Sequence, residues 1–237
     1  MANDPRAPDG GEQLPLDFPV ETRFGSDDFL SAPANEAALA LVRAWPDWPD
    51  RIVSLVGPAG SGKSHLAAIW ASRAGARVIN PLSLPSPAAL AATPPGAMLI
   101  DDADRVIDET ALFHLMNFVI EHRLSLLMTR QRAPLPGEVA LPDLLSRLRR
   151  APAIEIGAPD DALVRAVLEK LCRDRQLSAD EPTLAYAALR LERSLDAARA
   201  FVTALDRTAL AQGRAVTRAL AAEVMAQSHG DEPEPED

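Results

Sequence analysis

The octapeptide GPAGSGKS, Gly57 to Ser64, lies between the apolar run IVSLV and the helical pattern HLAAIWASRA. A glycine-rich turn between a strand and a helix is the setting that a phosphate-binding P-loop requires. Its glycines let successive backbone N–H groups turn inward around a phosphate, and the helix adds the positive end of its dipole. The motif therefore predicts a nucleotide site made of Gly57, Pro58, Ala59, Gly60, Ser61, Gly62, Lys63, Ser64 and the following His65.

Two side chains of this loop have predicted roles in holding a nucleotide. Lys63 would bridge the β- and γ-phosphates as a point charge, and the hydroxyl of Ser64 would take one position on Mg²⁺. The expected cofactors are therefore ATP or ADP with Mg²⁺. An ordinary glycine-rich turn is the alternative, but here the motif, the strand before it and the helix after it occur together.

A pair of carboxylates follows an apolar run about forty residues later, in MLIDDADR. A buried strand that ends in Asp directs the carboxylate to the carboxyl edge of the sheet, beside the P-loop in a doubly wound fold. Asp101 suits Mg²⁺ coordination, directly or through water, and Asp102 suits positioning of an attacking water. An Asp-Asp strand end that serves only as a turn is the structural alternative.

Short apolar runs alternate with helical patterns over the first two thirds of the chain. The runs at 51–57, 76–80, 97–102, 124–129 and 151–157 predict five strands, and the patterns at 62–75, 109–123 and 141–150 predict helices between them. Such alternation predicts an α/β fold with a parallel sheet and helices on both faces.

After Pro159 the strand patterns stop. Apolar residues recur at helical spacing in 160–177, 181–191, 194–213 and 216–227, which predicts a small all-helical domain. We therefore expect a flexible arm over 1–22, an α/β nucleotide-binding domain over 23–158, a helical domain over 159–227 and an acidic, disordered tail over 228–237.

The composition limits the classes of partner and compartment. The chain has 237 residues, of which 47% are hydrophobic, and its 34 acidic and 24 basic side chains give a net charge of −10. Such a molecule repels a nucleic-acid backbone overall, although a local basic patch stays open. A single cysteine, Cys172, fits a reducing compartment. The N-terminal residues show no basic segment followed by an apolar run, and no uninterrupted apolar run of about 18 residues occurs in the sequence. We expect a cytoplasmic protein with no membrane segment.

Several of these features together resemble the AAA+ ATPases, and within them the DnaA group with its shorter Hda-type regulators. They are the P-loop, the MLIDD strand, the polar strand end in LLMTRQRAP, the LPDLLSRL helix and the helical lid, so the resemblance covers about residues 22 to 227. It implies an AAA+ fold with five parallel strands. It also implies that Phe29, Leu30 and Asn35 pack around adenine; a helix entry with Asn35 near its cap is the alternative.

The resemblance assigns roles to three more side chains. Arg147 matches the arginine finger, which reaches the γ-phosphate on a neighbouring subunit and stabilises transition-state charge. Arg193 matches the lid arginine that touches the nucleotide of its own subunit, and Gln131 falls at the first sensor, where the family has an acidic or amide side chain. The alternative for both arginines is a solvated position on a helix. Arg149 and Arg150 depart from the aromatic and acidic continuation common in the family.

The hexapeptide QLPLDF, residues 13–18, interrupts an arm of low hydrophobicity. It resembles the peptide by which bacterial replication proteins bind the DNA polymerase III β sliding clamp. Gln13 would be the polar anchor, Leu14, Leu16 and Phe18 the apolar anchors, and Asp17 part of the same peptide. Pro15 would lower the cost of ordering the extended segment. The alternative is a strand or staple that docks on its own domain.

The resemblance favours a regulator over a DNA-melting initiator. We expect no DNA-reading domain after the lid, and the connection 81–96 has room for one short helix and no insertion. We therefore expect a clamp-bound protein, without direct sequence-specific DNA binding, that docks on the AAA+ domain of DnaA and uses Arg147 to stimulate hydrolysis of DnaA-bound ATP, so that replication does not re-initiate. Its own P-loop would act mainly as a switch with a weak ATPase. Two alternatives remain, a helicase loader or other DNA-acting ATPase, and a small-molecule kinase, against which the helical lid with Arg193 argues. Whether the chain forms a homo-oligomer stays open.

Overall fold

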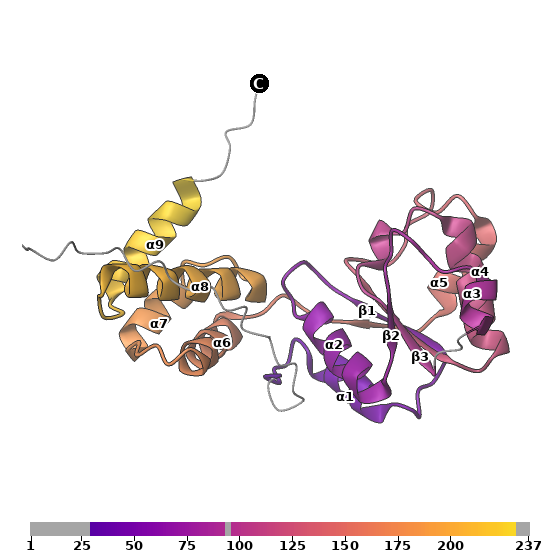
Figure 1. Cartoon of the computed structure of the whole chain (residues 1–237), viewed down its shortest axis with the longest axis horizontal. Helices are drawn as coiled ribbons and strands as arrows, with labels where there is room; N and C mark the ends of the chain where they lie inside the picture. Colours follow the sequence, from indigo (N-terminus) through magenta and orange to yellow (C-terminus); the bar gives the residue numbers. More distant parts are fainter. Residues whose placement is uncertain (1–28, 93–95, 231–237) are drawn as a thin grey trace, which may run out of the picture.

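A computed structural model describes residues 29–92 and 96–230 (Figure 1). Within them it has a five-stranded parallel sheet flanked by helices, followed by a group of helices without strands. The fold class predicted from the sequence is confirmed. The proposed clamp peptide, Gln13 to Phe18, and the acidic residues 231–237 lie outside the described residues.

The sheet has the strand order β2-β3-β4-β1-β5, and every pairing in it is parallel. Its strands are β1 (Ile52–Val56), β2 (Arg77–Ile79), β3 (Ala97–Ile100), β4 (Ser125–Arg130) and β5 (Ala153–Glu155). Each falls within one residue of, or inside, a run that the sequence predicted. β3 stops at Ile100, so Asp101 and Asp102 lie beyond the strand at its carboxyl end.

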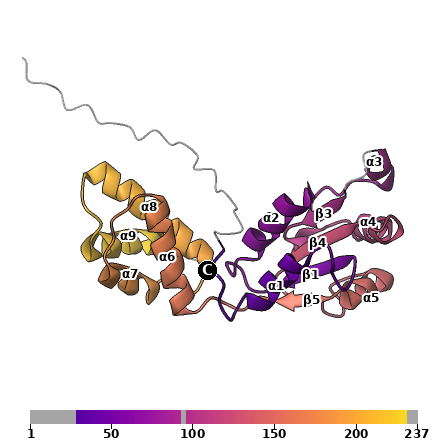
Figure 2. The same ribbon diagram turned by 90° about the horizontal axis from the view of Figure 1, so that it is seen from below.

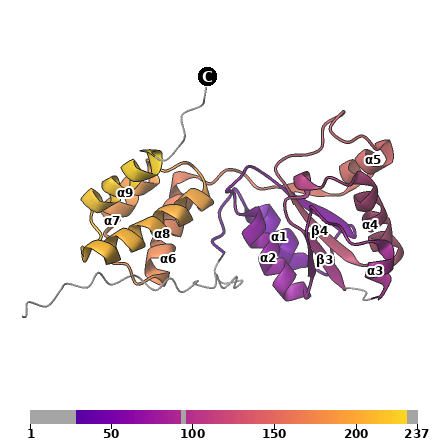
Figure 3. The same ribbon diagram turned by 45° about the horizontal axis from the view of Figure 1, so that its top comes forward.

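Alternate residues of the three central strands face different layers of helices, so both faces of the sheet are buried (Figure 3). On one face Val53, Leu99 and Leu127 pack with α1 (Glu36–Ala44) and α2 (Lys63–Ala74). On the other face their neighbours in sequence pack with α4 (Glu109–Glu121) and α5 (Pro142–Arg150). This arrangement explains why the strands read as continuous apolar runs.

The helical part contains α6 (Asp161–Asp174), α7 (Glu181–Ala188), α8 (Leu195–Gln212) and α9 (Arg218–Gly230), which lie together in Figure 2. These helices have their own core of buried residues. The first three of these helices begin after a residue whose side chain accepts a hydrogen bond from a backbone N–H of the first turn. These caps are Asp160, Asp180 and Ser194. Short polar side chains at this position stabilise helix starts, which explains where these helices begin.

The connection between β2 and β3 contains one six-residue helix, α3 (Pro87–Ala92), as its length predicted. A short 3₁₀ helix, η2 (Ala103–Arg105), follows the carboxylate pair at the end of β3. In the described part of the chain no helix combines the length and the apolar character needed to span a bilayer.

Candidate nucleotide site and finger pocket

The P-loop joins the carboxyl end of β1 to the amino end of α2. Gly60 and Gly62 have φ angles of 67° and 97°, in the left-handed region that glycine adopts most easily. Gly57 lies against the backbone after β5, because a Cβ there would be 2.2 Å from the carbonyl oxygen of Ile156. The loop therefore depends on glycine both for its turns and for its close approach to the sheet.

Lys63 is buried at the first position of α2 and donates a hydrogen bond of 2.6 Å to the carbonyl oxygen of Pro58. Burial lowers the pKa of its ammonium group, while the negative charges of Asp102 and Asp101 oppose this shift. The structure thus brings the predicted phosphate-binding lysine and both predicted carboxylates to one end of the sheet. A bound polyphosphate would replace the carbonyl as the partner of the ammonium.

The donor groups of the loop fit a phosphate and a hard cation. The Ser61 hydroxyl is buried and has no hydrogen-bond partner among the described residues, so a phosphate oxygen would satisfy it. Ser64, in the first turn of α2, and Asp101 offer hydroxyl and carboxylate oxygens, the ligands that Mg²⁺ prefers. When bound, Mg²⁺ would neutralise phosphate charge in this position.

Thr129, near the end of β4, links the carboxylate pair to the neighbouring strand. Its hydroxyl donates to Oδ1 of Asp101 at 2.6 Å and accepts from the backbone N–H of Asp102 at 2.8 Å. Asp102 itself has a φ angle of 54°, which is uncommon for a residue other than glycine. Thr129 is fully buried, so it fixes the carboxylate of Asp101 and the backbone turn after it.

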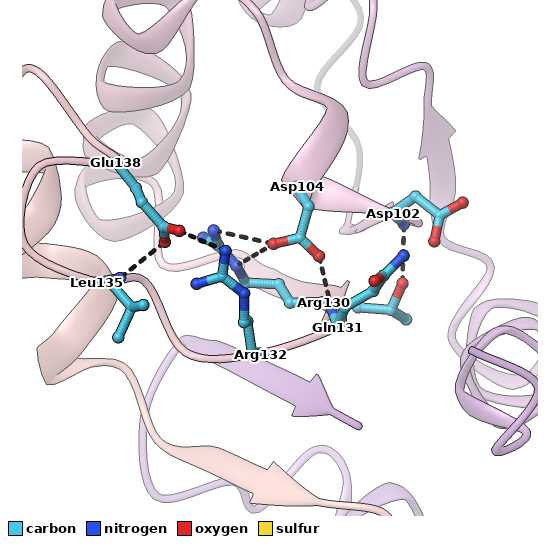
Figure 4. A network of polar contacts seen from close by, with 8 residues as sticks. Asp102, Asp104, Arg130, Gln131, Arg132, Leu135 and Glu138 are labelled. Atoms are coloured by element: carbon cyan, nitrogen blue, oxygen red, sulfur yellow. Dashed lines mark hydrogen bonds and ion pairs between the residues drawn. The ribbon is translucent and has the colours of Figure 1, made fainter. Parts of the chain in front are cut away.

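Asp104, in η2, forms a second link to the end of β4 (Figure 4). Its carboxylate accepts from Nε of Arg130 at 3.1 Å and from the backbone N–H of Gln131 at 2.5 Å. Gln131, the predicted first sensor, is exposed and lines a hollow of about 310 Å³ together with Gly57 and Pro58. The structure therefore places Gln131 beside the P-loop, with its backbone held by Asp104.

The lid touches the P-loop directly at the start of α8. The backbone N–H of Leu195 donates to the carbonyl oxygen of Gly60 at 2.7 Å. A Cβ added to Gly60 would come within 1.9 Å of the Ser194 hydroxyl oxygen. The backbone of the P-loop at Gly60 is therefore in direct contact with the amino end of α8.

A second contact between lid and loop passes through His65. Its Nδ1 lies 3.2 Å from the Arg199 guanidinium on α8, and its ring meets the ring of Phe29 edge-on, with centroids 5.7 Å apart. Phe29 therefore lies beside the first turn of α2, where the resemblance implies an adenine contact. Leu30 is half-buried, and its carbonyl oxygen accepts a hydrogen bond from the Asn35 amide, which does not cap α1.

Arg193 lies just before α8, and its guanidinium pairs with the Asp161 carboxylate at the start of α6, at 3.0 Å. Two thirds of its side chain is exposed. The predicted lid arginine is thus held within the lid in this conformation. To touch a nucleotide it would have to leave Asp161.

Arg147 is far from the P-loop, near the amino ends of the strands, whereas the P-loop follows the carboxyl end of β1. It lines a pocket of about 500 Å³, here called the finger pocket, which also includes Ile52, the first residue of β1. Its guanidinium carbon lies 5.1 Å from the centre of the Phe113 ring, a cation–π contact. The remaining residues that line the finger pocket are Asp50, Arg51, Met116, Ile120, Asp143, Ser146, Arg150 and Ala151.

Several residues that position the site were not singled out for it from the sequence. They are Thr129, Asp104, Ser194 and Arg199. Two of them had a readable signal: Thr129 is a polar residue inside an apolar strand run, and Ser194 precedes a helical pattern as caps do. The contact of Arg199 with His65 depends on how the lid docks, and nothing local in the sequence reveals it.

Comparison with known proteins gives related folds and one related sequence. No family model matches the chain. The chromosomal replication initiator protein DnaA of Caulobacter sp. (strain K31) is 28% identical over an alignment of 236 residues, which covers 87% of this chain and 48% of that protein. The chain therefore spans about half the length of the curated relative it matches.

Among solved structures, domain III of the Thermotoga maritima replication initiation protein DnaA superimposes with a TM-score of 0.72 at 18% identity, over 89% of this chain and 98% of that one. AMPPCP-bound DnaA from Aquifex aeolicus gives 0.65 at 16% identity, over 89% and 70%. The RuvB Holliday junction branch migration motor of Thermotoga maritima gives 0.64 at 17%, over 80% and 66%. The chain therefore has the AAA+ P-loop NTPase fold seen in DnaA domain III and RuvB, and it is similar in sequence to a replication initiator.

Proposed function

We propose that this protein is a DnaA-related regulator that binds ATP or ADP with Mg²⁺ and stimulates hydrolysis of the ATP bound to DnaA. The observation that carries the proposal is the distance between its two candidate catalytic regions. Arg147 shares a pocket with Ile52 at the start of β1, whereas the P-loop follows Val56 at the end of the same strand. Five strand residues separate these points by roughly 16 Å.

A guanidinium near the amino ends of the strands is too far from the P-loop to reach the nucleotide of its own subunit. It is available to a nucleotide on another subunit, which is what an arginine finger supplied in trans requires. There the planar guanidinium would bind the equatorial oxygens of the γ-phosphate and stabilise the charge of the transition state. Contributions of this kind accelerate hydrolysis by about 10³- to 10⁵-fold.

The chain's own nucleotide site would act mainly as a switch, with a weak ATPase from Asp101, Asp102 and Gln131. The contact between Gly60 and the start of α8 supports this role, since a nucleotide held by the loop would act on the lid through it. Arg193 would complete the site after release from Asp161. This arrangement makes the position of the lid depend on the ligand.

The proposed tether to DNA is the QLPLDF peptide, Gln13 to Phe18, bound to the β sliding clamp. The chemistry of the peptide supports this role, since three large apolar residues alternate with polar or proline positions in a segment otherwise poor in apolar residues. The net charge of −10 disfavours direct binding to a DNA backbone, so a protein tether suits this chain. A homo-oligomer would be compatible with the same finger geometry.

A DNA-acting AAA+ ATPase is the second candidate, because the last turn of α5 carries three arginines, Arg147, Arg149 and Arg150, which also suit phosphate contacts. The two candidates predict different stimuli. A DNA-acting enzyme would hydrolyse ATP faster when nucleic acid is added and would be indifferent to the clamp.

The test is to mix ATP-loaded DnaA with this protein and with clamp loaded on DNA, and to follow hydrolysis of the DnaA-bound ATP. We expect stimulation that requires the clamp and that is lost when Leu16 and Phe18 are both replaced by Ala. Binding of nucleotide to the double variant should be unchanged. Hydrolysis that does not respond to the protein would reject its proposed role as a regulator. Hydrolysis that is stimulated equally by the double variant would reject the proposed tether.

A further inference from the structure

The finger pocket is lined by two arginines in addition to the proposed finger. Besides Arg147 it is lined by Arg51, which precedes β1, and by Arg150, which is one helical turn beyond Arg147 on the same face of α5. Its floor is apolar and includes Phe113 and Met116. Three guanidinium groups therefore surround one hollow in a chain whose net charge is −10.

Among the residues that the structure describes, these three arginines have no carboxylate partner. Within residues 29–92 and 96–230 no carboxylate forms an ion pair with any of them, although Asp50 and Asp143 line the same pocket. Eight other arginines described in the structure do pair with a carboxylate: Arg130, Arg132, Arg165, Arg173, Arg175, Arg193, Arg199 and Arg214. Unpaired guanidiniums that converge on a hollow are a site for an anion brought by something else.

The arrangement also favours a phosphate over a single carboxylate. The ring of Phe113 supports Arg147 from its face, which leaves the N–H groups at the edge of the guanidinium free to donate. Each guanidinium can bind two oxygens side by side, and a triphosphate offers enough oxygens for several such contacts, whereas one carboxylate satisfies only one. Local positive charge in an acidic protein is complementary to a polyphosphate.

We propose that Arg150 and Arg51, together with Arg147, form the binding site for the triphosphate of the nucleotide carried by the partner subunit. The inference rests on the proposed function and assigns different roles to the three arginines. Arg147 acts on the reacting phosphate, while Arg150 and Arg51 hold the polyphosphate and so make docking depend on the nucleotide of the partner. ATP-bound DnaA would then be preferred over ADP-bound DnaA at the moment of binding.

The experiment measures the binding of the full chain to DnaA loaded with AMPPCP, loaded with ADP, or free of nucleotide, followed by stimulated hydrolysis with ATP. The variants are Arg150→Ala, Arg150→Lys and the matched control Arg149→Ala. Arg149 is exposed on the same helical turn but does not line the pocket, so its replacement removes the same charge from the same place. Circular dichroism confirms that each variant is folded.

We expect Arg150→Ala to weaken binding to AMPPCP-loaded DnaA by about tenfold, the effect of losing one charge-assisted contact, and to leave binding to nucleotide-free DnaA within about twofold. Arg150→Lys should recover part of the loss and Arg149→Ala should match the wild type. In the hydrolysis assay Arg150→Ala should raise the half-saturating concentration, whereas Arg147→Ala should lower the maximal rate.

Equal weakening by Arg150→Ala with all three forms of DnaA would show that Arg150 contacts the protein and not the nucleotide, which overturns the inference. The same conclusion follows if Arg149→Ala weakens binding as much as Arg150→Ala. Loss of stimulation in Arg147→Ala with unchanged behaviour of Arg150→Ala rejects the inference and keeps the proposed function. A wild-type chain that neither binds nor stimulates DnaA rejects both.

Discussion

The two ends of the sheet's strands, the carboxyl end at the P-loop and the amino end at the finger pocket, are here called its two edges. They differ in how their polar groups are satisfied. At the P-loop edge Lys63 bonds to Pro58, Thr129 bonds to Asp101, and Asp104 holds both Arg130 and the backbone of Gln131. At the opposite edge the arginines of the finger pocket have no carboxylate partner among the described residues. One end is held by internal hydrogen bonds, and we propose that the other is completed by a partner that docks on it.

The difference follows from burial. Thr129 and Lys63 are almost fully buried, and buried polar groups that lack partners cost free energy, so this edge needs its internal hydrogen bonds to fold. Arg150 and Arg51 are exposed, so water can solvate them in the absence of a partner. Substitutions at the first edge should therefore change stability and nucleotide binding, whereas substitutions at the second should change only what happens on a partner.

The largest effect at the organised edge is expected from Gly60→Ala. The new Cβ would meet Ser194 at a left-handed φ, so the start of α8 must move in addition to the backbone strain of about 1–2 kcal/mol. Gly75→Ala is the matched control, because Gly75 has a similar φ of 57° and open space around it. Urea denaturation should show that Gly60→Ala lowers the free energy of unfolding by at least about 1 kcal/mol more than Gly75→Ala does. Equal losses of unfolding free energy would mean that the contact of Ser194 with Gly60 leaves no constraint on the P-loop.

A smaller effect is expected from Thr129→Val, which keeps the shape of the side chain and removes its hydroxyl. The half-buried N–H of Asp102 would lose its partner at a cost of about 1–3 kcal/mol, and the carboxylate of Asp101 would lose its orientation. The Mg²⁺ concentration that half-saturates nucleotide binding should rise in Thr129→Val and stay near the wild-type value in Thr129→Ser. If both variants bind Mg²⁺ and nucleotide alike, the hydroxyl has no part in orienting Asp101.

The smallest effect is a change of protonation at Lys63. Burial lowers the pKa of Lys63 below its ordinary value of 10.5, and the phosphates of a bound nucleotide would raise it again. Between the lowered pKa and 10.5 the free protein has lost part of a proton that binding restores. Calorimetry in two buffers of different ionisation enthalpy should therefore show fractional proton uptake by Lys63 that increases as the pH rises toward 10.5. Uptake that does not increase with pH would count against this account.

Much of the α/β fold could be predicted from the sequence because both faces of its sheet are buried. Strands such as Ile52–Val56 are then continuous apolar runs, and the glycines of the P-loop mark the turn that follows. The short helix Pro87–Ala92 followed from the length of its connection. Boundaries were less certain: β3 ends at Ile100 because the two aspartates after it turn away into η2.

The contacts of the site were harder to predict because they join residues far apart in the chain. The P-loop and the carboxylate pair follow from local patterns, but Thr129 meets Asp101 only because β3 and β4 are neighbours in the sheet. The pairing of Arg193 with Asp161, which keeps the predicted lid arginine inside the lid, likewise depends on how α6 and α8 pack. Side-chain partners across elements require the tertiary structure.

The most direct test of the central claim is single-turnover hydrolysis of labelled ATP preloaded on DnaA, with clamp on DNA and with the wild-type chain, Arg147→Ala or Lys63→Ala. In parallel, the affinity of each variant for its own nucleotide is measured. We predict that Arg147→Ala lowers the stimulated rate by about 10³-fold or more and changes its own nucleotide affinity by less than about twofold, whereas Lys63→Ala loses its own nucleotide. Stimulation that survives in Arg147→Ala, or a nucleotide affinity that falls with it, would contradict the assignment of the two edges to two different nucleotides.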